Sequence, residues 1–300
     1  MKRCKPYSSS EPRAKRGASR EGEVEVLDSA PRSNNKRGRV HSLESFSAQD
    51  GPGIRYVIFL QGCLARCLYC HNPDTWDTKA GILMPAGDIF KKIEKTLPYI
   101  RSSKGGVTVS GGEPLLQIPF LVELFKLCKK ASIHTCIDTS GFCKSQHDSR
   151  QPSRGWCLAP PKLRGRCDTT PLWLPQLGQL IDLTDLFLVD LKAIDPELHK
   201  KITGRSVDEV FSFIEFLEKK KKPYWLRYVL VPGLNNKKEH IKPLKEFLSK
   251  LKYCEKFEFL PYHTLGVNKW KLLGLKCPLK NTPAATSSDI QSAISIIANP

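Results

Sequence analysis

From residue 40 onward, short runs of branched and aromatic residues alternate with longer stretches in which apolar residues recur at helical spacing. Short apolar runs are typical of buried strands, and apolar residues three and four positions apart are typical of one buried helix face. The expected strands are Ile54–Leu60, Gly106–Val109, Ile133–Ile137, Leu186–Asp190, Tyr224–Val231 and Phe257–Leu260. The expected helix faces are Ile89, Ile93 and Leu97; Leu121, Leu124, Phe125 and Cys128; Val210, Phe211, Ile214 and Leu217; and Ile241, Leu244, Leu248 and Leu251.

Strands that alternate with helices predict right-handed crossovers and a parallel sheet. Polar motifs follow the expected strands: a cysteine loop at 62–72, then 110–113, 138–141, 190–192, 231–233 and 261–263. Parallel α/β barrels carry their active sites at the carboxyl ends of the strands, so we expect these motifs to meet. With six βα units rather than eight, the expected fold is α/β, a partial (βα)6 TIM-like barrel. Its open side would admit something larger than a metabolite.

The chain has 48 Lys and Arg against 30 Asp and Glu, a formal net charge of +18. A basic excess attracts nucleic-acid phosphates, but residues 1–40 hold 11 Lys or Arg and 5 Asp or Glu, so a third of the excess lies there. The rest is scattered, apart from a run at 219–222 that closes a helix, where cations suit the helix dipole. We therefore expect no nucleic-acid partner. No apolar run reaches the roughly 18 residues of a membrane helix, and we expect no membrane association.

Residues 1–37 are rich in Ser, Arg, Lys, Pro and Glu and have few residues that could form a core. We expect them to be a disordered basic extension ahead of a single barrel domain over residues 38–300. An organelle transit peptide would be poor in acids, whereas Glu21, Glu23 and Glu25 interrupt this segment. We therefore expect a cytoplasmic protein, with an organellar location as the alternative if residues 1–37 act as a transit peptide.

Three cysteines, Cys63, Cys67 and Cys70, lie on one short loop after the first expected strand. Iron-sulfur clusters normally use four protein cysteines, and a metal site that is one protein ligand short keeps a position for a reactant. The spacing therefore indicates a [4Fe-4S] cluster with one open iron. A zinc site would need a fourth ligand, which His71 is badly placed to supply directly after Cys70. A disulfide is disfavoured because no secretory signal precedes the loop.

The cysteine loop, with an aromatic residue before its last cysteine, resembles the radical S-adenosylmethionine (SAM) enzymes. Over roughly residues 38 to 275, the chain is similar to the pyruvate formate-lyase activating enzymes within that superfamily. The segments that carry the resemblance are His41–Ser45, Asp50–Arg55, Gln61–Asp77, Ser110–Glu113, Asp190–Lys192 and Leu260–His263. The resemblance implies the same partial barrel, and it implies that the cluster and SAM carry the chemistry without an acid or base side chain.

Relative to this family, the chain has roughly 25 to 30 additional residues, approximately 143–170, which show neither helical nor strand period. A long loop without secondary structure is unusual inside a compact domain. We interpret the segment as a disordered insertion, with a translated unspliced intron and an extra cluster site as the alternatives. Its cysteines at 143, 157 and 167 fit no compact cluster spacing.

The resemblance also assigns residues to SAM. It places the methionine amino group at Gly112, the carboxylate at Lys192, and a ribose hydroxyl or a cation at Asp190. Asp138 and Thr139 would help to hold the amino group and a monovalent cation. The full set implied for SAM is Tyr69, Cys70, His71, Gly112, Asp190, Leu191, Lys192 and His263, with Gly111, Asp138 and Thr139 as secondary members. Asp50 would contact the substrate peptide.

By the same resemblance, the reduced cluster and SAM would form a 5′-deoxyadenosyl radical that removes a glycine Cα hydrogen from pyruvate formate-lyase under anaerobic conditions. A flavodoxin-like or ferredoxin-like protein would supply the electron, and the enzyme would be a monomer. The alternatives are an activase of another glycyl-radical enzyme, a tRNA-modifying radical SAM enzyme, and, in a different class, a zinc or nucleic-acid-binding module without catalytic activity.

Overall fold

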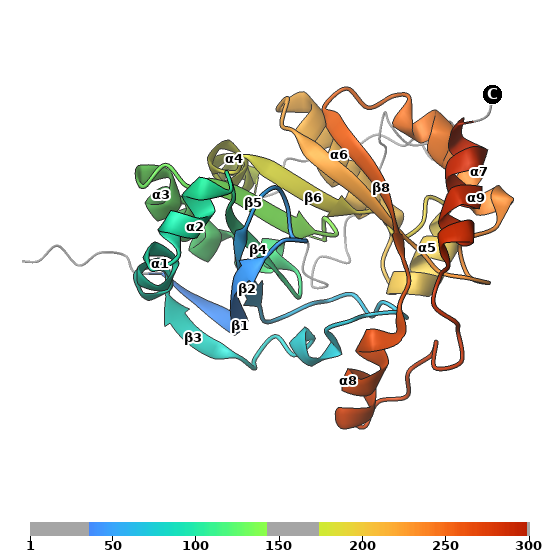
Figure 1. Cartoon of the computed structure of the whole chain (residues 1–300), viewed down its shortest axis with the longest axis horizontal. Coiled ribbons are helices and arrows are strands. Elements are labelled where there is room, and N and C mark those ends of the chain that lie inside the picture. The colour runs from blue at the N-terminus through green and yellow to red at the C-terminus, as the bar shows by residue number, and fades with distance from the viewer. Residues whose placement is uncertain (1–35, 143–173, 299–300) are drawn as a thin grey trace, which may run out of the picture. The chain divides into compact units, whose positions relative to one another are not determined.

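The computed structural model describes residues 36–142 and 174–298. Within them, eight strands form one sheet in the order β3-β1-β2-β4-β5-β6-β7-β8 (Figure 1). The strands are β1 (Arg37–Ser47), β2 (Arg55–Leu60), β3 (Ile82–Pro85), β4 (Gly106–Gly111), β5 (His134–Thr139), β6 (Leu186–Asp190), β7 (Tyr224–Leu230) and β8 (Cys254–Pro261). All but the last two residues of the predicted extension, and the whole predicted insertion at 143–170, lie outside the described residues.

The six predicted strands are confirmed, and each is parallel to its neighbour from β2 to β8. Phe59 of β2 pairs with Ser110 of β4, and Val109 of β4 pairs with Ile137 of β5. Because the strands are parallel and nearly in register, their carboxyl ends meet at one edge of the sheet. β3 and β8 are the two ends of the strand order, so the sheet does not close, as expected for a partial barrel.

β1 and β3 were not predicted. β1 is antiparallel to both β2 and β3, with Leu43 opposite Ile58 and Arg39 opposite Leu83. The sequence of β1 is mostly polar, and Val40 is its one fully buried large apolar residue. A strand of this composition gives little hydrophobic signal, and it forms here because it pairs along the edge of β2.

The helices are α1 (Ala86–Glu94), α2 (Leu97–Ser102), α3 (Ile118–Lys130), α4 (Leu174–Leu183), α5 (Pro196–Thr203), α6 (Val207–Lys219), α7 (Lys238–Leu248), α8 (Val267–Leu272) and α9 (Ser287–Ala298). Short 3-10 turns are η1 (Pro73–Thr75), η2 (Pro114–Gln117) and η4 (Thr264–Gly266). The single helix face predicted through Leu97 is wrong, because α1 ends at Glu94 and α2 begins at Leu97. Pro98 explains the break, since proline in a helix interior removes a hydrogen bond and clashes with the preceding turn.

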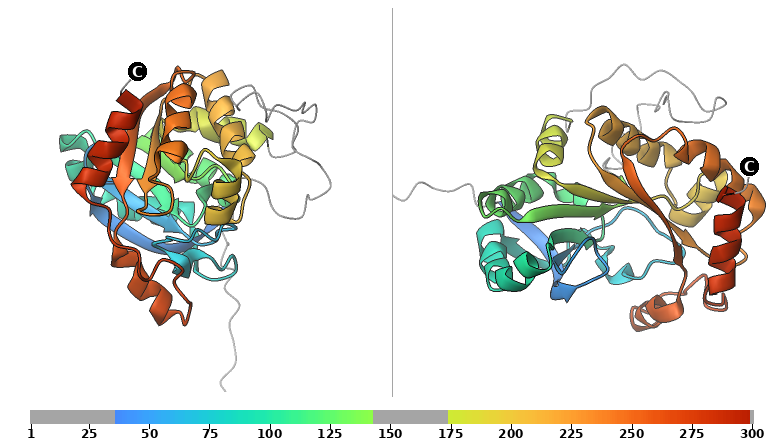
Figure 2. Two further views of the ribbon diagram at one scale, coloured as in Figure 1. Left: turned by 90° about the vertical axis from the view of Figure 1, so that its right-hand side faces the viewer. Right: turned by 45° about the horizontal axis from the view of Figure 1, so that its top comes forward.

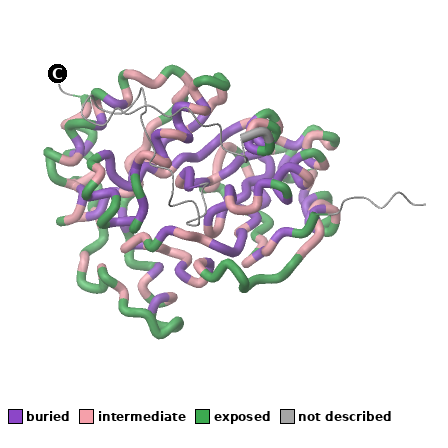
Figure 3. The backbone as a smooth tube through the Cα atoms, turned by 180° about the vertical axis from the view of Figure 1, so that it is seen from behind, coloured by how far each residue is buried: buried purple, intermediate pink, exposed green. Residues whose placement is uncertain are grey.

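The two faces of the sheet have different environments. Along β7, Tyr224, Leu226 and Tyr228 are fully buried under the outer helices, whereas Arg227 and Val229 alternate with them and line a cavity. Helices cover the outside of the curved sheet (Figure 2), and buried positions concentrate along the strands (Figure 3). The inner face is therefore the one that offers polar groups to a ligand.

Candidate active site

A cavity of about 280 Å³ lies at the carboxyl ends of the parallel strands. It brings together residues that are up to 200 positions apart in the sequence, from Cys63 to His263. The predicted site residues that line it are Cys63, Cys67, Tyr69, Cys70, His71, Gly111, Gly112, Asp138, Thr139, Asp190, Lys192 and His263. The structure thus places the cysteine loop and the strand-end motifs around one space.

Two predicted residues do not line this cavity. The Leu191 side chain is fully buried in the core, and its backbone N–H donates to the Arg227 carbonyl at 2.9 Å. Asp50 accepts a hydrogen bond from the Ser47 hydroxyl, and its own carbonyl accepts one from the Thr108 hydroxyl at 2.7 Å. Asp50 therefore lies before β2 and not among the strand-end groups.

The cysteine loop is held by backbone hydrogen bonds from two directions. Gly62 N–H donates to the Thr75 carbonyl at 2.7 Å, which closes the loop on the segment that follows it. Arg66 and Leu68 N–H groups donate to the carbonyls of Thr203 and Ile202, at 2.8 and 2.9 Å. These bonds fasten the middle of the loop to the end of α5. The three thiols consequently sit on a fixed backbone.

Cys63, Cys67 and Cys70 are free thiols. Burial raises the pKa of Cys63 and of Cys67 to about 12, and it raises the pKa of Cys70 as well. Thiolates are the form that ligates metals. Buried thiols of this kind become thiolates when a metal supplies positive charge beside them.

The glycine pair at the end of β4 is required by the cysteine loop. Gly112 N–H donates to the Leu60 carbonyl at 2.9 Å, and Glu113 N–H donates to the Gly62 carbonyl at 2.8 Å. A Cβ on Gly112 would lie 2.2 Å from the Gly62 oxygen. Gly111 has φ +108°, and a Cβ there would lie 2.3 Å from the Leu60 nitrogen. No side chain fits at either position without moving backbone.

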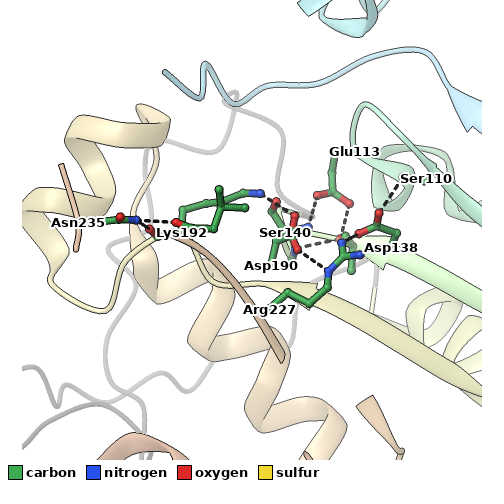
Figure 4. Close-up of polar contacts among 11 residues, drawn as sticks. Ser110, Glu113, Asp138, Ser140, Asp190, Lys192, Arg227 and Asn235 are labelled. Carbon is green, nitrogen blue, oxygen red and sulfur yellow. Dashed lines mark hydrogen bonds and ion pairs between the residues drawn. The ribbon is translucent and has the colours of Figure 1, made fainter. Parts of the chain in front are cut away.

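Four charged side chains form a network across the cavity floor (Figure 4). Arg227 contacts the carboxylates of both Asp138 and Asp190, the second at 2.8 Å from its Nε. Lys192 Nζ lies 2.6 Å from the other oxygen of Asp190, and the Ser110 hydroxyl donates to Asp138 at 2.9 Å. Two carboxylates face two cations, so the network is neutral overall and presents both signs of charge to a zwitterion.

Burial favours the neutral form of Asp190, but Arg227 and Lys192 outweigh it and lower the pKa of Asp190 to about 2. The pKa of Lys192 is raised, since Asp190 and Cys67 outweigh the effect of burial. Both groups are therefore ionised at neutral pH. The sequence did not reveal Arg227, although a lone arginine among the apolar residues of a predicted strand is a usable signal.

Glu113 was also missed as an individual residue, although its motif was singled out. Its carboxylate accepts hydrogen bonds from the Thr139 hydroxyl and from the N–H groups of Leu115 and Ser140, both at 3.1 Å. Burial raises the pKa of Glu113 to about 7. Glu113 therefore ties the end of β4 to the end of β5, which fixes Thr139 beside the cavity.

Aromatic side chains line the side of the cavity nearest the last cysteine. The rings of His71 and His263 stack with centroids 4.1 Å apart. Tyr69 is buried, its hydroxyl has no hydrogen-bond partner among the described residues, and Lys192 Nζ lies 5.9 Å from its ring centroid. Flat rings beside a cavity suit a planar heterocycle.

A segment near the end of the described chain closes on the cysteine loop. The Trp270 indole N–H of α8 donates to the Cys70 carbonyl at 2.9 Å, and the ring meets that of Trp76 edge to face at 5.1 Å. Lys269 Nζ lies 2.8 Å from Asn72 Oδ1 and 3.2 Å from Asp74. The sequence reasoning did not find these supports, because 200 residues separate Trp270 from Cys70.

Residues 57–247 match the radical SAM superfamily. The chain is 43% identical over 258 residues to a pyruvate formate-lyase-activating enzyme of Staphylococcus epidermidis, covering 86% of this chain and 94% of that protein. It is 40% identical over 260 residues to the enzyme of that name from Listeria monocytogenes, covering 87% of this chain and 96% of that protein. The chain belongs to the radical SAM superfamily and, within it, to the pyruvate formate-lyase-activating enzyme family.

The fold agrees with this membership. A radical SAM methyltransferase from Sphaerobacter thermophilus superposes with a TM-score of 0.53 and 13% identity, covering 81% of this chain and 63% of that one. Membership in the radical SAM superfamily implies a [4Fe-4S] cluster and SAM. Among the described residues, no helix combines the length and the apolar character needed to span a bilayer.

The residues present fit these two groups. Three free thiols of one loop line a single cavity. In the described ranges, no group of three His, Cys, Asp or Glu side chains could hold a single metal ion. A cubane cluster does not require such a group, because each cysteine binds a different iron. Lys192 and Asp190 line the same cavity and offer both charges. A zwitterionic cofactor therefore finds complementary groups there.

Proposed function

We propose that this protein activates pyruvate formate-lyase by generating a radical on one of its glycines. The observation that carries the proposal is the convergence of the three free cysteines and the Asp138–Arg227–Asp190–Lys192 network on one cavity. The convergence occurs in a chain that is 40–43% identical, over most of its length, to proteins named pyruvate formate-lyase-activating enzyme.

In this proposal, Cys63, Cys67 and Cys70 ligate three irons of the [4Fe-4S] cluster. No fourth cysteine among the described residues lines the cavity, so one iron would be left without a protein thiolate and could bind SAM. Arg66 supports the loop with two hydrogen bonds from Nη1, to the carbonyls of Cys63 and Ala65, both at 2.7 Å. The loop is thus preorganised for the cluster by its own backbone.

The same cavity would hold SAM beside the cluster. Lys192 binds the carboxylate, the Gly112 backbone and Asp138 receive the amino group, and Asp190 accepts from a ribose hydroxyl. The rings of Tyr69, His71 and His263 contact the adenine, with Gly111, Thr139, Leu191 and the Cys70 backbone completing the surroundings. A monovalent cation would bind beside Asp138 and Thr139. The support is geometric: ionised groups of both signs line the same cavity as the thiols.

When bound, the cluster and SAM supply a 5′-deoxyadenosyl radical, which removes a hydrogen atom from a glycine Cα of the partner. The chain's own residues position the cofactor, and they shield the site, since Tyr69 and Lys192 are almost fully buried. No side chain acts as a general acid or base. The unclosed sheet leaves room for a peptide of pyruvate formate-lyase, with Asp50 as a peptide contact. We place the enzyme in the cytoplasm as a monomer that receives electrons from a flavodoxin-like or ferredoxin-like protein.

The test is anaerobic reconstitution with iron and sulfide, followed by reduction and mixing with SAM and pyruvate formate-lyase. Electron paramagnetic resonance should show a glycyl doublet. Cys67→Ser should abolish both the cluster absorption and the doublet. Cys254→Ser is the matched control, because Cys254 lies in β8 as a half-buried free thiol away from the cavity, and it should retain both signals. A well-folded, cluster-loaded protein that yields no doublet would refute the proposed activity.

A further inference from the structure

Residues 259–288 contain four lysines and no Asp or Glu. This stretch also holds the most exposed leucines of the described chain, with Leu272 85% exposed and Leu265 79% exposed. Leu273 and Leu275 add further exposed apolar surface. Figure 3 shows α8 and the stretch after it as largely exposed. A basic surface with large exposed apolar side chains is typical of a protein-protein interaction site.

Three of the four lysines are available to a partner. Lys269 is already engaged with Asn72 and Asp74. Lys271, Lys276 and Lys280 are exposed, and none forms a salt bridge within the described residues. We call Leu265, Leu272, Leu275, Lys271, Lys276 and Lys280 the α8 surface.

α8, which carries Lys271 and Leu272 of the α8 surface, lies next to the cysteine loop. α8 packs on η1, the turn that follows the loop (Figure 1). Trp270 joins the two, since its indole N–H donates to the Cys70 carbonyl at 2.9 Å while its ring packs against Trp76. On the outer side of Trp76, the Arg66 guanidinium lies 4.9 Å from the ring centroid. The buried side chain of Trp270 therefore connects α8 to the cysteine loop.

We propose that the α8 surface is the docking site for the acidic one-electron carrier protein that reduces the cluster. This inference rests on the proposed function, which requires one electron per turnover from a donor protein: the carrier loses one electron, and the cluster gains it. An acidic carrier has a charge complementary to this basic surface. Electron tunnelling weakens steeply with distance, and α8 adjoins the cysteine loop through the Trp270 hydrogen bond to Cys70.

The test measures binding and electron transfer separately. The dissociation constant of oxidised flavodoxin for the reconstituted protein is measured by titration calorimetry at low and moderate ionic strength. We expect Lys271→Glu/Lys276→Glu to weaken binding by about tenfold or more at low salt, because such surface charges steer association. The rate of cluster bleaching by reduced flavodoxin, without SAM or pyruvate formate-lyase, should fall similarly. Leu272→Ser should weaken binding with less change in salt dependence.

The control is Lys92→Glu/Lys95→Glu, which makes the same charge change on exposed residues at the end of α1, far from α8 (Figure 1). It should bind the carrier like the wild type. With chemical reduction by dithionite, the α8-surface variant should still generate the glycyl radical normally. Unchanged carrier binding by the α8-surface variant would overturn the inference. A loss of the glycyl radical that persists with dithionite would also overturn it, because the α8 surface would then bind pyruvate formate-lyase instead of the carrier. Carrier binding is measured without forming the glycyl radical. It therefore tests the docking site even if the protein does not activate pyruvate formate-lyase.

Discussion

At the residue scale, the cavity is defined by charged groups from three neighbouring strands. Asp138 ends β5, Asp190 ends β6 with Lys192 just beyond it, and Arg227 projects from the middle of β7. Their hydrogen bonds and ion pairs hold each in one orientation before any ligand arrives (Figure 4). Preorganised charges of this kind bind a charged cofactor without first having to be ordered.

Arg227 is the group on which this arrangement depends most. Arg227→Leu would leave Asp138 and Asp190 as neighbouring buried carboxylates without the arginine between them. We therefore expect the free energy of unfolding to fall by about 3–5 kcal/mol. Urea unfolding of the cluster-free protein measures this. Arg101→Leu, at an exposed position in the last turn of α2, should change it by no more than about 0.5 kcal/mol. Equal stability of the two variants would show that Arg227 is dispensable to the fold.

Sequence reasoning at this scale identified the thiols and Asp138, Asp190 and Lys192, but not their connection. Arg227 lies 89 positions from Asp138, and no local pattern links the two residues. The pairing follows from the order of strands β5, β6 and β7 in the sheet. That order becomes visible only once the strands are assembled.

At the element scale, the end of β4 packs closely against the start of the cysteine loop. The family resemblance assigned Gly112, with Gly111 as a secondary residue, to the binding of SAM. The structure adds a different reason, because the two glycines pack against the backbone of Leu60 and Gly62. The position of the cysteine loop therefore depends on β4, which pairs with β2, the strand that leads into the loop.

Gly112→Ala should push the backbone of Gly62 away from the end of β4. Its new Cβ would lie 2.2 Å from the Gly62 oxygen, and we expect a loss of about 2–4 kcal/mol of stability with impaired cluster uptake. Iron and sulfide analysis after reconstitution, together with thermal unfolding, measures both effects. Gly178→Ala is the matched control, since Gly178 lies inside α4 with nothing within 4 Å of a Cβ, and alanine should add up to about 1 kcal/mol. Full cluster loading of Gly112→Ala would contradict this view of the glycine pair.

α8 provides a second element-scale test, because it holds the cysteine loop from outside. Trp270→Phe keeps most of the ring packing against Trp76 but removes the hydrogen bond to the Cys70 carbonyl. We expect about 1 kcal/mol of lost stability and faster loss of the reconstituted cluster to a chelator. Time courses of absorbance in the presence of the chelator measure this. A chelation rate equal to that of the wild type would argue against a role for the bond in holding the loop.

At the scale of the whole molecule, the six-strand parallel core could be read from the sequence because its strands are short, apolar and separated by helices. β1 and β3 could not be predicted from the sequence, because these antiparallel strands at the edge of the sheet bury little apolar surface. The convergence of the motifs at one edge was also predictable, because it follows from parallel topology alone.

The half-buried His134 makes the stability of the molecule depend on pH. The pKa of His134 is lowered to about 4 by burial and by Arg55, whose Nη1 lies 3.1 Å from the His134 Nδ1. Between pH 6.5 and pH 4, the unfolded chain binds a proton at this residue and the folded chain does not, so acidification through this window removes stability. His134→Gln should lose less stability over the same window, as measured by urea midpoints at several pH values. The raised pKa of Glu113 changes stability with pH in the opposite direction. Glu113 is present in both proteins, so its contribution cancels in the comparison. An identical pH dependence in the two proteins would contradict the assignment.

The most direct test of the account is the fate of the glycine hydrogen. Pyruvate formate-lyase labelled with deuterium at its glycine Cα positions is mixed anaerobically with the reduced, cluster-loaded protein and SAM, and the 5′-deoxyadenosine formed is analysed by mass spectrometry. The account predicts 5′-deoxyadenosine that carries one deuterium, formed in proportion to the glycyl radical. Unlabelled 5′-deoxyadenosine, or a glycyl radical formed without it, would contradict the claim that this cavity generates the radical that attacks the glycine.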